Sequence, residues 1–217
     1  MQAIGAVIFD MDGVLVDSEP LYMEQEKSSC LRYGVTLNEK DLSRFLGTTQ
    51  HYMWSTIKNE YALTESIDHL MAQHQQQLMR SISFELFQSM PGVEALLNLL
   101  EHTGVPCAVA SSSPRNLVEL ILKKTKLRRF FKEVICGTDV KESKPNPEIF
   151  LTAAKGLGVS PRACLVIEDS HHGVTAAKAA HMFCIGLRHS SSFQQDLSAA
   201  DLIANNHYDI KQWFAEK

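Results

Sequence analysis

Short apolar runs that lack polar/apolar alternation recur along the chain, and polar residues follow most of them. The first run, from Ile4 to Phe9, is rich in branched side chains and leads directly into Asp10. Such a run is typical of a strand covered on both faces, as in the middle of a parallel sheet. Further strands are predicted over residues 106–110, 133–136, 163–167 and 182–187, with a short one near Leu202 and Ile203.

Helical patterns separate these strands after residue 90. They cover residues 91–102, 114–126, 146–157 and 172–180, and an amphipathic helix around 210–214 ends the chain. Ser113 before Pro114 and Asn146 before Pro147 are expected to cap two of these helices. An alternation of strand and helix is the signature of a parallel sheet built from crossover units. We therefore predict an α/β fold with a Rossmann-like parallel sheet core, in the strand order 3-2-1-4-5.

Residues 17–88 interrupt this pattern, because they contain helical stretches and no convincing strand. The first predicted helix begins at Ser18 and Pro20 and ends before Gly34. Others are predicted over residues 39–45, 51–61 and 65–83. We therefore expect two domains, an α/β core domain of residues 1–16 and 89–217 and an inserted all-helical domain of residues 17–88.

Polar side chains that could carry chemistry share one position, the end of a predicted strand. In a parallel sheet the carboxyl ends of all strands lie on one edge, and ligands bind in the crevice at a topological switch point of that edge. If the second and fourth strands flank the first, the switch point lies there. The residues concerned are Asp10 and Asp12 after the first strand, Ser111 after the second, Lys144 in the loop after the third, and Glu168 with Asp169 after the fourth.

This set combines acids with groups that bind anions. Asp10 and Asp12 can project to the same side of an extended chain, and two such acids repel unless a cation or a proton lies between them. Carboxylate oxygens are suited to a hard cation such as Mg²⁺. Lys144, Ser111 and the first amides of the helix at Pro114 suit an anion with several oxygens, above all a phosphoryl group. A carboxylate beside such a group can attack it and form an aspartyl-phosphate.

Composition restricts the class of protein without changing this hypothesis. The chain has 217 residues, 45% of them apolar and 21% charged, which is usual for a globular protein. Its net charge of −4 gives no general attraction to nucleic acid or to an anionic membrane, and no stretch resembles a leader or a membrane span. Five cysteines without a close pair are interpreted as small buried residues. We expect a cytoplasmic protein, with a monomer as the default.

Four separated motifs carry a resemblance to a known family. They are DMDGVL at residues 10–15 with DSE at 17–19, AVASSS at 108–113, SKPNP at 143–147, and EDS at 168–170 with Gly173. In this order they resemble the haloacid dehalogenase superfamily, specifically its β-phosphoglucomutase-like phosphatase branch, over essentially the whole chain. The resemblance implies a Mg²⁺-dependent phosphatase that acts on a small phosphorylated metabolite, such as a sugar or sugar-alcohol phosphate. It also implies that the helical insertion is a mobile cap, which excludes water and selects the substrate.

The same resemblance assigns roles to the acids. Asp10 would be the nucleophile that forms an aspartyl-phosphate, and Asp12 would protonate the leaving oxygen and then deprotonate the attacking water. Mg²⁺ would be held by Asp10, the backbone carbonyl of Asp12 and Asp169, with Glu168 as a nearby or water-mediated ligand.

Other positions would contact the substrate. Ser111 and Lys144 would bind the transferring oxygens and stabilise the transition state. Further substrate-binding residues are expected at Ser112, Arg115 and Asn116 in the core domain and at Gly47, Thr48 and Gln50 in the cap.

Departures from the motifs of a phosphosugar mutase favour transfer of the phosphoryl group to water. Gln50 stands where a mutase of this branch has a cap arginine, and Tyr22 stands where it has a histidine. Arg115 and Asn116, however, follow the serine motif much as a basic residue and Asn do in the mutase, so a β-phosphoglucomutase-type activity is the alternative. Tyr22 and Trp54 are each expected either to line the substrate cavity or to pack the cap.

An alternative of another class is a non-catalytic phosphate-binding or phosphorylatable protein that keeps the aspartate pocket. The intact set of Asp10, Asp12, Lys144 and Asp169 argues against it. Release of phosphate from a simple aryl phosphate would separate the two hypotheses.

Overall fold

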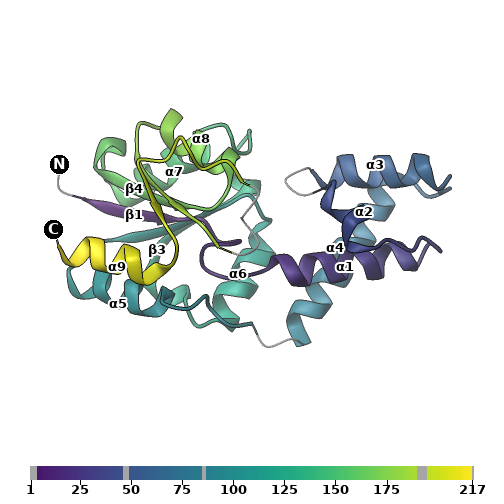
Figure 1. Cartoon of the computed structure of the whole chain (residues 1–217), viewed down its shortest axis with the longest axis horizontal. Coiled ribbons are helices and arrows are strands. Elements are labelled where there is room, and N and C mark those ends of the chain that lie inside the picture. Colours follow the sequence, from purple (N-terminus) through teal and green to yellow (C-terminus); the bar gives the residue numbers. More distant parts are fainter. Residues whose placement is uncertain (1–3, 46–48, 85–86, 190–194, 217) are drawn as a thin grey trace. The chain divides into compact units, whose positions relative to one another are not determined.

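The computed structural model in Figure 1 describes residues 4–45, 49–84, 87–189 and 195–216. The chain divides into two compact units. One unit is formed by Met1–Asp17 together with Phe87–Lys217, and the other by Ser18–Leu86.

A parallel six-stranded sheet forms the centre of the first unit. Its order is β3-β2-β1-β4-β5-β6, so the predicted order of the first five strands is confirmed and the short strand near Leu202 adds a sixth at the edge. Every residue of the three central strands β1, β2 and β4 is buried, as the uninterrupted apolar runs predict. The strands are β1 (Ala6–Phe9), β2 (Cys107–Ser111), β3 (Phe131–Cys136), β4 (Cys164–Glu168), β5 (Phe183–Leu187) and β6 (Leu202–Ala204).

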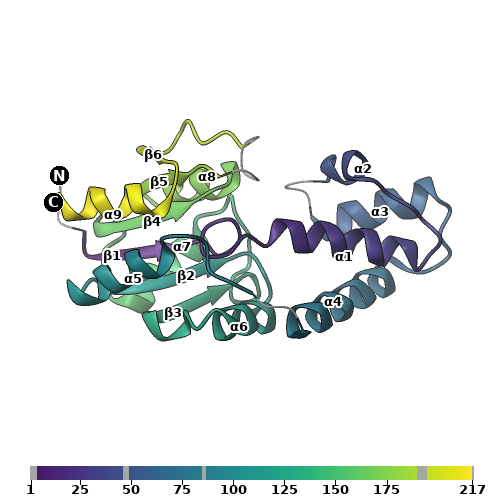
Figure 2. The same ribbon diagram turned by 60° about the horizontal axis from the view of Figure 1, so that its bottom comes forward.

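Helices cover both faces of this sheet, with α7 and α8 on one face and α5 and α9 on the other (Figures 1 and 2). On the first face, Ile8 of β1 and Val166 of β4 share a buried cluster with Phe150 of α7 and Val174 of α8. The helices are α5 (Val93–His102), α6 (Arg115–Lys124), α7 (Glu148–Leu157), α8 (His171–Ala179) and α9 (His207–Ala215), with short 3-10 helices at Arg128–Phe130, Gly137–Asp139 and Pro161–Ala163. The structure is therefore the predicted α/β fold.

The second unit is helical throughout its described residues. It consists of α1 (Glu19–Leu31), α2 (Glu39–Ser43), α3 (Gln50–Glu60) and α4 (Ile67–Phe84). Trp54 of α3 is fully buried in its core, where the ring of Tyr33 meets it edge-on at 6.2 Å. Of the two roles left open for Trp54, the structure therefore supports packing of the helical unit.

Helix starts are where the sequence-based expectations differ most from the structure. Ser18 occupies the N-cap of α1, but its side chain makes no capping hydrogen bond. Pro114 rather than Ser113 is the N-cap of α6. Asn146 lies before the N-cap of α7, yet its Oδ1 accepts a hydrogen bond from the backbone N–H of Glu148 at 2.9 Å, so it still satisfies a free donor of the first turn.

Both ends of the insertion are attached to one point of the α/β unit. The chain leaves this unit after Asp17 and returns at Phe87. The backbone N–H of Met90 then donates to the carbonyl of Leu15 at 2.9 Å. The outgoing and returning segments are thus joined three residues beyond Asp12.

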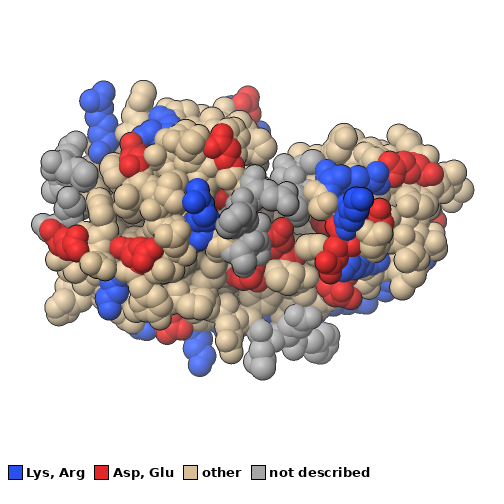
Figure 3. Space-filling model, viewed as in Figure 1, with Lys and Arg blue, Asp and Glu red and all other residues tan. Residues whose placement is uncertain are grey.

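The surface and the cysteines agree with the compositional analysis. All five cysteines are unpaired and buried, which confirms their interpretation as small core residues. Acidic and basic side chains are interspersed on the face drawn in Figure 3, so this face carries no field of a single sign. Within the part of the chain that the structure describes, no helix is both long and apolar enough to span a bilayer.

A buried histidine in the helical unit makes stability depend on pH. His74 is 4% exposed, and its Nδ1 lies 2.9 Å from Oγ of Ser29. Burial lowers the pKa of His74 from 6.5 to about 4. Between these values the unfolded chain binds a proton that the folded chain does not, so stability is lost as the pH falls.

We expect the free energy of unfolding to fall by up to about 3 kcal/mol from this group between pH 6.5 and pH 4. His74→Gln should reduce that slope, whereas His69→Gln, at an exposed position of the same helix, should leave it unchanged. Urea denaturation followed over this pH range measures both slopes, and equal slopes for the two variants would contradict the prediction.

Candidate active site

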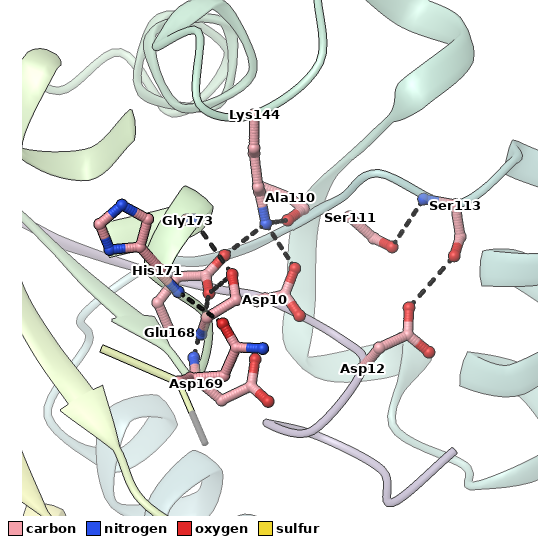
Figure 4. A network of polar contacts seen from close by, with 12 residues as sticks. Asp10, Asp12, Ala110, Ser111, Ser113, Lys144, Glu168, Asp169, His171 and Gly173 are labelled. Atoms are coloured by element: carbon pink, nitrogen blue, oxygen red, sulfur yellow. Dashed lines mark hydrogen bonds and ion pairs between the residues drawn. The ribbon is translucent and has the colours of Figure 1, made fainter. Parts of the chain in front are cut away.

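The site lies at the point of the sheet where the order of successive strands reverses. Both β2 and β4 flank β1, so the topological switch point lies at the carboxyl end of β1. Asp10 follows β1 there, and its backbone N–H donates to the carbonyl of Ile167 in β4 at 3.0 Å. Figure 4 shows the side chains of the strand ends turned toward one another at this point. The structure therefore brings together residues up to 159 positions apart in the sequence, from Asp10 to Asp169.

The amine of Lys144 lies between two acids. Its Nζ donates to Oδ1 of Asp10 at 2.5 Å, to Oε1 of Glu168 at 2.6 Å and to the carbonyl of Ala110 at 2.9 Å. The side chains of Lys144, Asp10 and Glu168 are only 6%, 9% and 1% exposed. Desolvation alone would lower the pKa of Lys144, but the charges of Asp10 and Glu168 outweigh it and raise that pKa. The amine is therefore a fixed positive charge with all its protons donated.

Glu168 uses both carboxylate oxygens inside the protein. Oε1 accepts from Lys144, while Oε2 accepts from the backbone N–H groups of Asp169 and Ser170 and from the Ser170 hydroxyl, at 2.9 to 3.0 Å. A Cβ atom on Gly173 of α8 would overlap this carboxyl group, so only glycine leaves room for it. Glu168 holds Lys144 against Asp10 and ties the end of β4 to the start of α8. Its role as a metal ligand stays a prediction.

Asp10 has three other acids close to it, Glu168, Asp12 and Asp169. Burial raises its pKa well above the usual range, the acids Glu168, Asp12 and Asp169 raise it further, and Lys144 counteracts them. Of the two carboxylate oxygens of Asp10, only Oδ1 accepts a hydrogen bond from a described residue, and the donor is Lys144. The other oxygen is thus available to a ligand.

Asp12 and the serine motif lie beside this cluster. The Ser113 hydroxyl donates to Oδ2 of Asp12 at 3.1 Å (Figure 4). Ser111 is fully buried, and its Oγ accepts from the backbone N–H of Ser113 at 3.1 Å. Ser113, interpreted from the sequence as a helix cap, therefore orients the carboxylate of Asp12 instead.

Asp169 has a partner that sequence analysis did not identify. Its Oδ2 lies 3.0 Å from Nε2 of His189. The pKa of Asp169 is raised to about 6. Burial is the main cause, the hydrogen bond from His189 counteracts it, and the charge of Glu168 adds to it. His189 follows the fifth strand, so the same rule of polar residues at strand ends could have indicated it.

The other residues predicted to bind substrate are not part of the cluster of Asp10, Lys144 and Glu168. The Arg115 guanidinium donates to Oδ2 of Asp139 at 2.5 Å and to the carbonyl of Val134 at 2.9 Å. Asn116 uses its Oδ1 to accept from the N–H of Leu117, and Ser112 is exposed. Gln50 is the first residue of α3, while Gly47 and Thr48 lie outside the described residues.

The donor set of this cluster fits a hard divalent cation. Oδ1 of Asp169 accepts no hydrogen bond from any described residue, and one oxygen of Asp10 is equally available. Among the residues that the structure describes, no group of three His, Cys, Asp or Glu side chains is arranged to hold a metal ion as it stands. The amine of Lys144 lies between the carboxylates of Asp10 and Glu168. The mutual repulsion that raises the pKa of Asp10 would be relieved by a cation at the two open oxygens.

A methyl group at position 173 tests the role of Glu168. Gly173→Ala should displace the Glu168 carboxylate and break its buried pair with Lys144, at a cost of about 3 kcal/mol in the free energy of unfolding. Gly156→Ala is the matched control, since its Cβ would meet only the side chain of Glu133, at 2.9 Å. Chemical denaturation of the two variants measures the difference, and a stable Gly173→Ala protein with Glu168 in place would contradict the assignment.

The chain is similar in sequence and in fold to known phosphatases and related enzymes. Residues 7–187 match the family model of the haloacid dehalogenase-like hydrolases. The phosphorylated carbohydrates phosphatase of Thermotoga maritima is 33% identical over 92% of this chain and 92% of its own. Hexitol phosphatase B of Escherichia coli is 33% identical over 82% of this chain and 80% of its own. The β-phosphoglucomutase structure from Clostridium difficile superimposes with a TM-score of 0.80, at 24% identity over 98% of this chain and 96% of that one, which shows the shared fold.

The family match spans strands β1 to β5 and the helical insertion, and it contains every predicted core-site residue from Asp10 to Asp169. With a parallel sheet of the predicted order and two phosphatases among its relatives, the chain belongs to the haloacid dehalogenase-like hydrolases, on the phosphatase branch of that family.

Proposed function

We propose that this protein is a Mg²⁺-dependent phosphatase that hydrolyses a sugar or sugar-alcohol phosphate through an aspartyl-phosphate on Asp10. The observation that carries the proposal is the buried contact of Asp10 with Lys144, beside Asp12, at the carboxyl end of β1. A nucleophile, a fixed positive charge and a second acid thus meet at the one edge where a sheet of this order binds ligands.

In this proposal Asp10 attacks the phosphorus atom with its available oxygen, and the bond from phosphorus to the substrate oxygen breaks. Asp12 gives its proton to that leaving oxygen and later takes one from the water that releases phosphate. The Ser113 hydroxyl, at 3.1 Å from Oδ2, keeps the Asp12 carboxyl oriented for both transfers. Glu168 and Asp10 together fix the position of the Lys144 amine. Its positive charge neutralises charge on the transferring oxygens.

Mg²⁺ would be held by Asp10, the backbone carbonyl of Asp12 and Asp169. When bound, the ion supplies positive charge that neutralises the phosphoryl oxygens. Asp169 contributes the oxygen that faces away from His189, and Glu168 acts on the site through Lys144 and through water.

The relatives support the substrate class. One is described as a phosphatase of phosphorylated carbohydrates and another as a hexitol phosphatase, and the match to the first covers 92% of both chains. The helical unit is proposed to select among such substrates as a cap, with Gly47, Thr48 and Gln50 as contact positions.

Hydrolysis is favoured over the mutase alternative by the environment of Arg115. Its Nε and Nη2 donate to Asp139, and Nη2 also donates to the carbonyl of Val134, so this edge of the guanidinium is already engaged within the protein. Gln50 carries no charge that could replace it. A phosphosugar mutase needs such a cation to hold its bisphosphate, whereas a hydrolase does not.

Substitution of the nucleophile tests the mechanism. Asp10→Asn should lower the rate of phosphate release from p-nitrophenyl phosphate and from sorbitol 6-phosphate by about a thousandfold or more, because the amide cannot attack phosphorus. Asp68→Asn, an exposed position in the first turn of α4, serves as the control and should keep the full rate. Activity of Asp10→Asn within tenfold of the unsubstituted protein would rule out the aspartyl-phosphate.

Removal of the metal tests the cofactor. Dialysis against EDTA should abolish phosphate release, and Mg²⁺ should restore it. At a concentration of about 100 times its dissociation constant, Mg²⁺ should also stabilise the folded protein by about 3 kcal/mol, because it binds the folded carboxylates and not the unfolded chain. Thermal unfolding with and without Mg²⁺ measures this shift, and full activity in EDTA would contradict the proposal.

A single assay separates hydrolase from mutase. With glucose 1-phosphate and glucose 1,6-bisphosphate present, a hydrolase should release inorganic phosphate, and a mutase should accumulate glucose 6-phosphate. Accumulation of glucose 6-phosphate faster than release of phosphate would favour the mutase.

A further inference from the structure

We propose that His189 is a positioning residue for the metal site, which holds one oxygen of Asp169 so that the other faces the cation. The inference rests on the Mg²⁺ site of the proposed function and extends it to a residue beyond the four family motifs. It concerns affinity for the metal, which is measured without substrate.

The backbone brings His189 to this place by strand pairing. Strand β5 lies beside β4 with Gly186 opposite Glu168, so the residues after each strand emerge next to each other. The N–H of Arg188 then donates to the carbonyl of Ala204 at 2.8 Å, which fastens the chain to β6 just before His189. The imidazole is therefore supported on a strand end rather than on a free loop.

The contact is sheltered from solvent. The side chains of His189 and Asp169 are 9% and 16% exposed, and Nε2 lies 3.0 Å from Oδ2. Since a carboxylate can only accept, the ring nitrogen donates. A hydrogen bond at this distance and burial restricts rotation of the carboxylate more than a solvated one would.

The two oxygens of Asp169 are thereby made unequal. Oδ2 is held by His189, and Oδ1 accepts no hydrogen bond from any residue that the structure describes. Glu168, the neighbouring acid, differs in having both oxygens occupied by protein donors. Of the two acids at the end of β4, Asp169 is thus the one prepared to ligate a cation.

The pair of Asp169 and His189 is packed against the backbone of Gly13, in the segment that follows β1. The φ angle of Gly13 is +76°, and a Cβ atom there would overlap the carboxylate of Asp169 and lie 2.8 Å from Nε2 of His189. The pair of Asp169 and His189 therefore lies directly over the segment that also carries Asp12. Only glycine at position 13 allows this approach.

A hydrogen-bond partner of a metal ligand typically changes metal affinity by about 10- to 100-fold when it is removed. A histidine that ligated the metal itself would behave differently, because imidazole nitrogen favours Mn²⁺ over Mg²⁺. The two roles can therefore be separated by comparing the two ions.

The experiment is calorimetric titration of the full chain with Mg²⁺ and with Mn²⁺, in the absence of substrate. His189→Leu should raise the dissociation constant by about 10- to 100-fold for both ions, and His189→Gln, whose amide can still donate, should recover most of the affinity. His172→Leu, an exposed histidine in the first turn of α8, is the matched control and should bind like the unsubstituted protein.

Any of four results would overturn the proposal. If His189→Leu binds Mg²⁺ within twofold of the unsubstituted protein, His189 does not position Asp169, although the proposed function stands. If the loss is confined to Mn²⁺, His189 is a ligand itself. If the unsubstituted protein binds no Mg²⁺, the metal of the proposed function falls as well. Should His189→Leu fail to fold, as seen in its urea denaturation, a His189→Gln protein with affinity as low as that of Asp169→Asn would also contradict the inference.

Discussion

The geometry of the site depends on one buried amine. Lys144 reaches the carboxylates of Asp10 and Glu168 and the carbonyl of Ala110, and so connects the ends of three neighbouring strands. A charge buried alone in such a place would be strongly destabilising, so each of the three charged residues is tolerated only because the others are present. The strand order that places β1 between β2 and β4 is therefore also what brings these three groups together.

The apparent excess of acid around that amine has a chemical meaning. Four acids, Asp10, Glu168, Asp12 and Asp169, outnumber the single lysine. Burial raises the pKa of Asp10, and the other three acids raise it further. A protein gains no stability from such repulsion, and groups with strongly shifted pKa values are typical of functional sites. Glycine at the points of closest approach completes the arrangement, because backbone and carboxylate could not otherwise come so near.

Much of this could be predicted because the sheet is encoded locally. Each strand is an apolar run with a polar end, so strand order and the positions of Asp10, Lys144 and Asp169 followed from pattern and from family motifs, with strand ends displaced by at most two or three residues. The pairing of Ser113 with Asp12 and of His189 with Asp169 could not be predicted in this way, although His189 itself stands just after a predicted strand. Ser113 meets Asp12 across 101 positions, and His189 meets Asp169 only because two strands pair in one register. Partners of this kind are decided by tertiary structure, and no spacing in the sequence marks them.

The hydrogen bond from Met90 to Leu15 has an evolutionary consequence. Because the outgoing and returning segments of the insertion are fastened together, the helical unit is grafted onto the sheet at a single point, much as a loop would be. Insertions and substitutions within the graft can change its length and packing without altering the strand order or the cluster of acids at the sheet edge. A lineage could thus remodel this unit while inheriting one unchanged set of polar groups in the sheet.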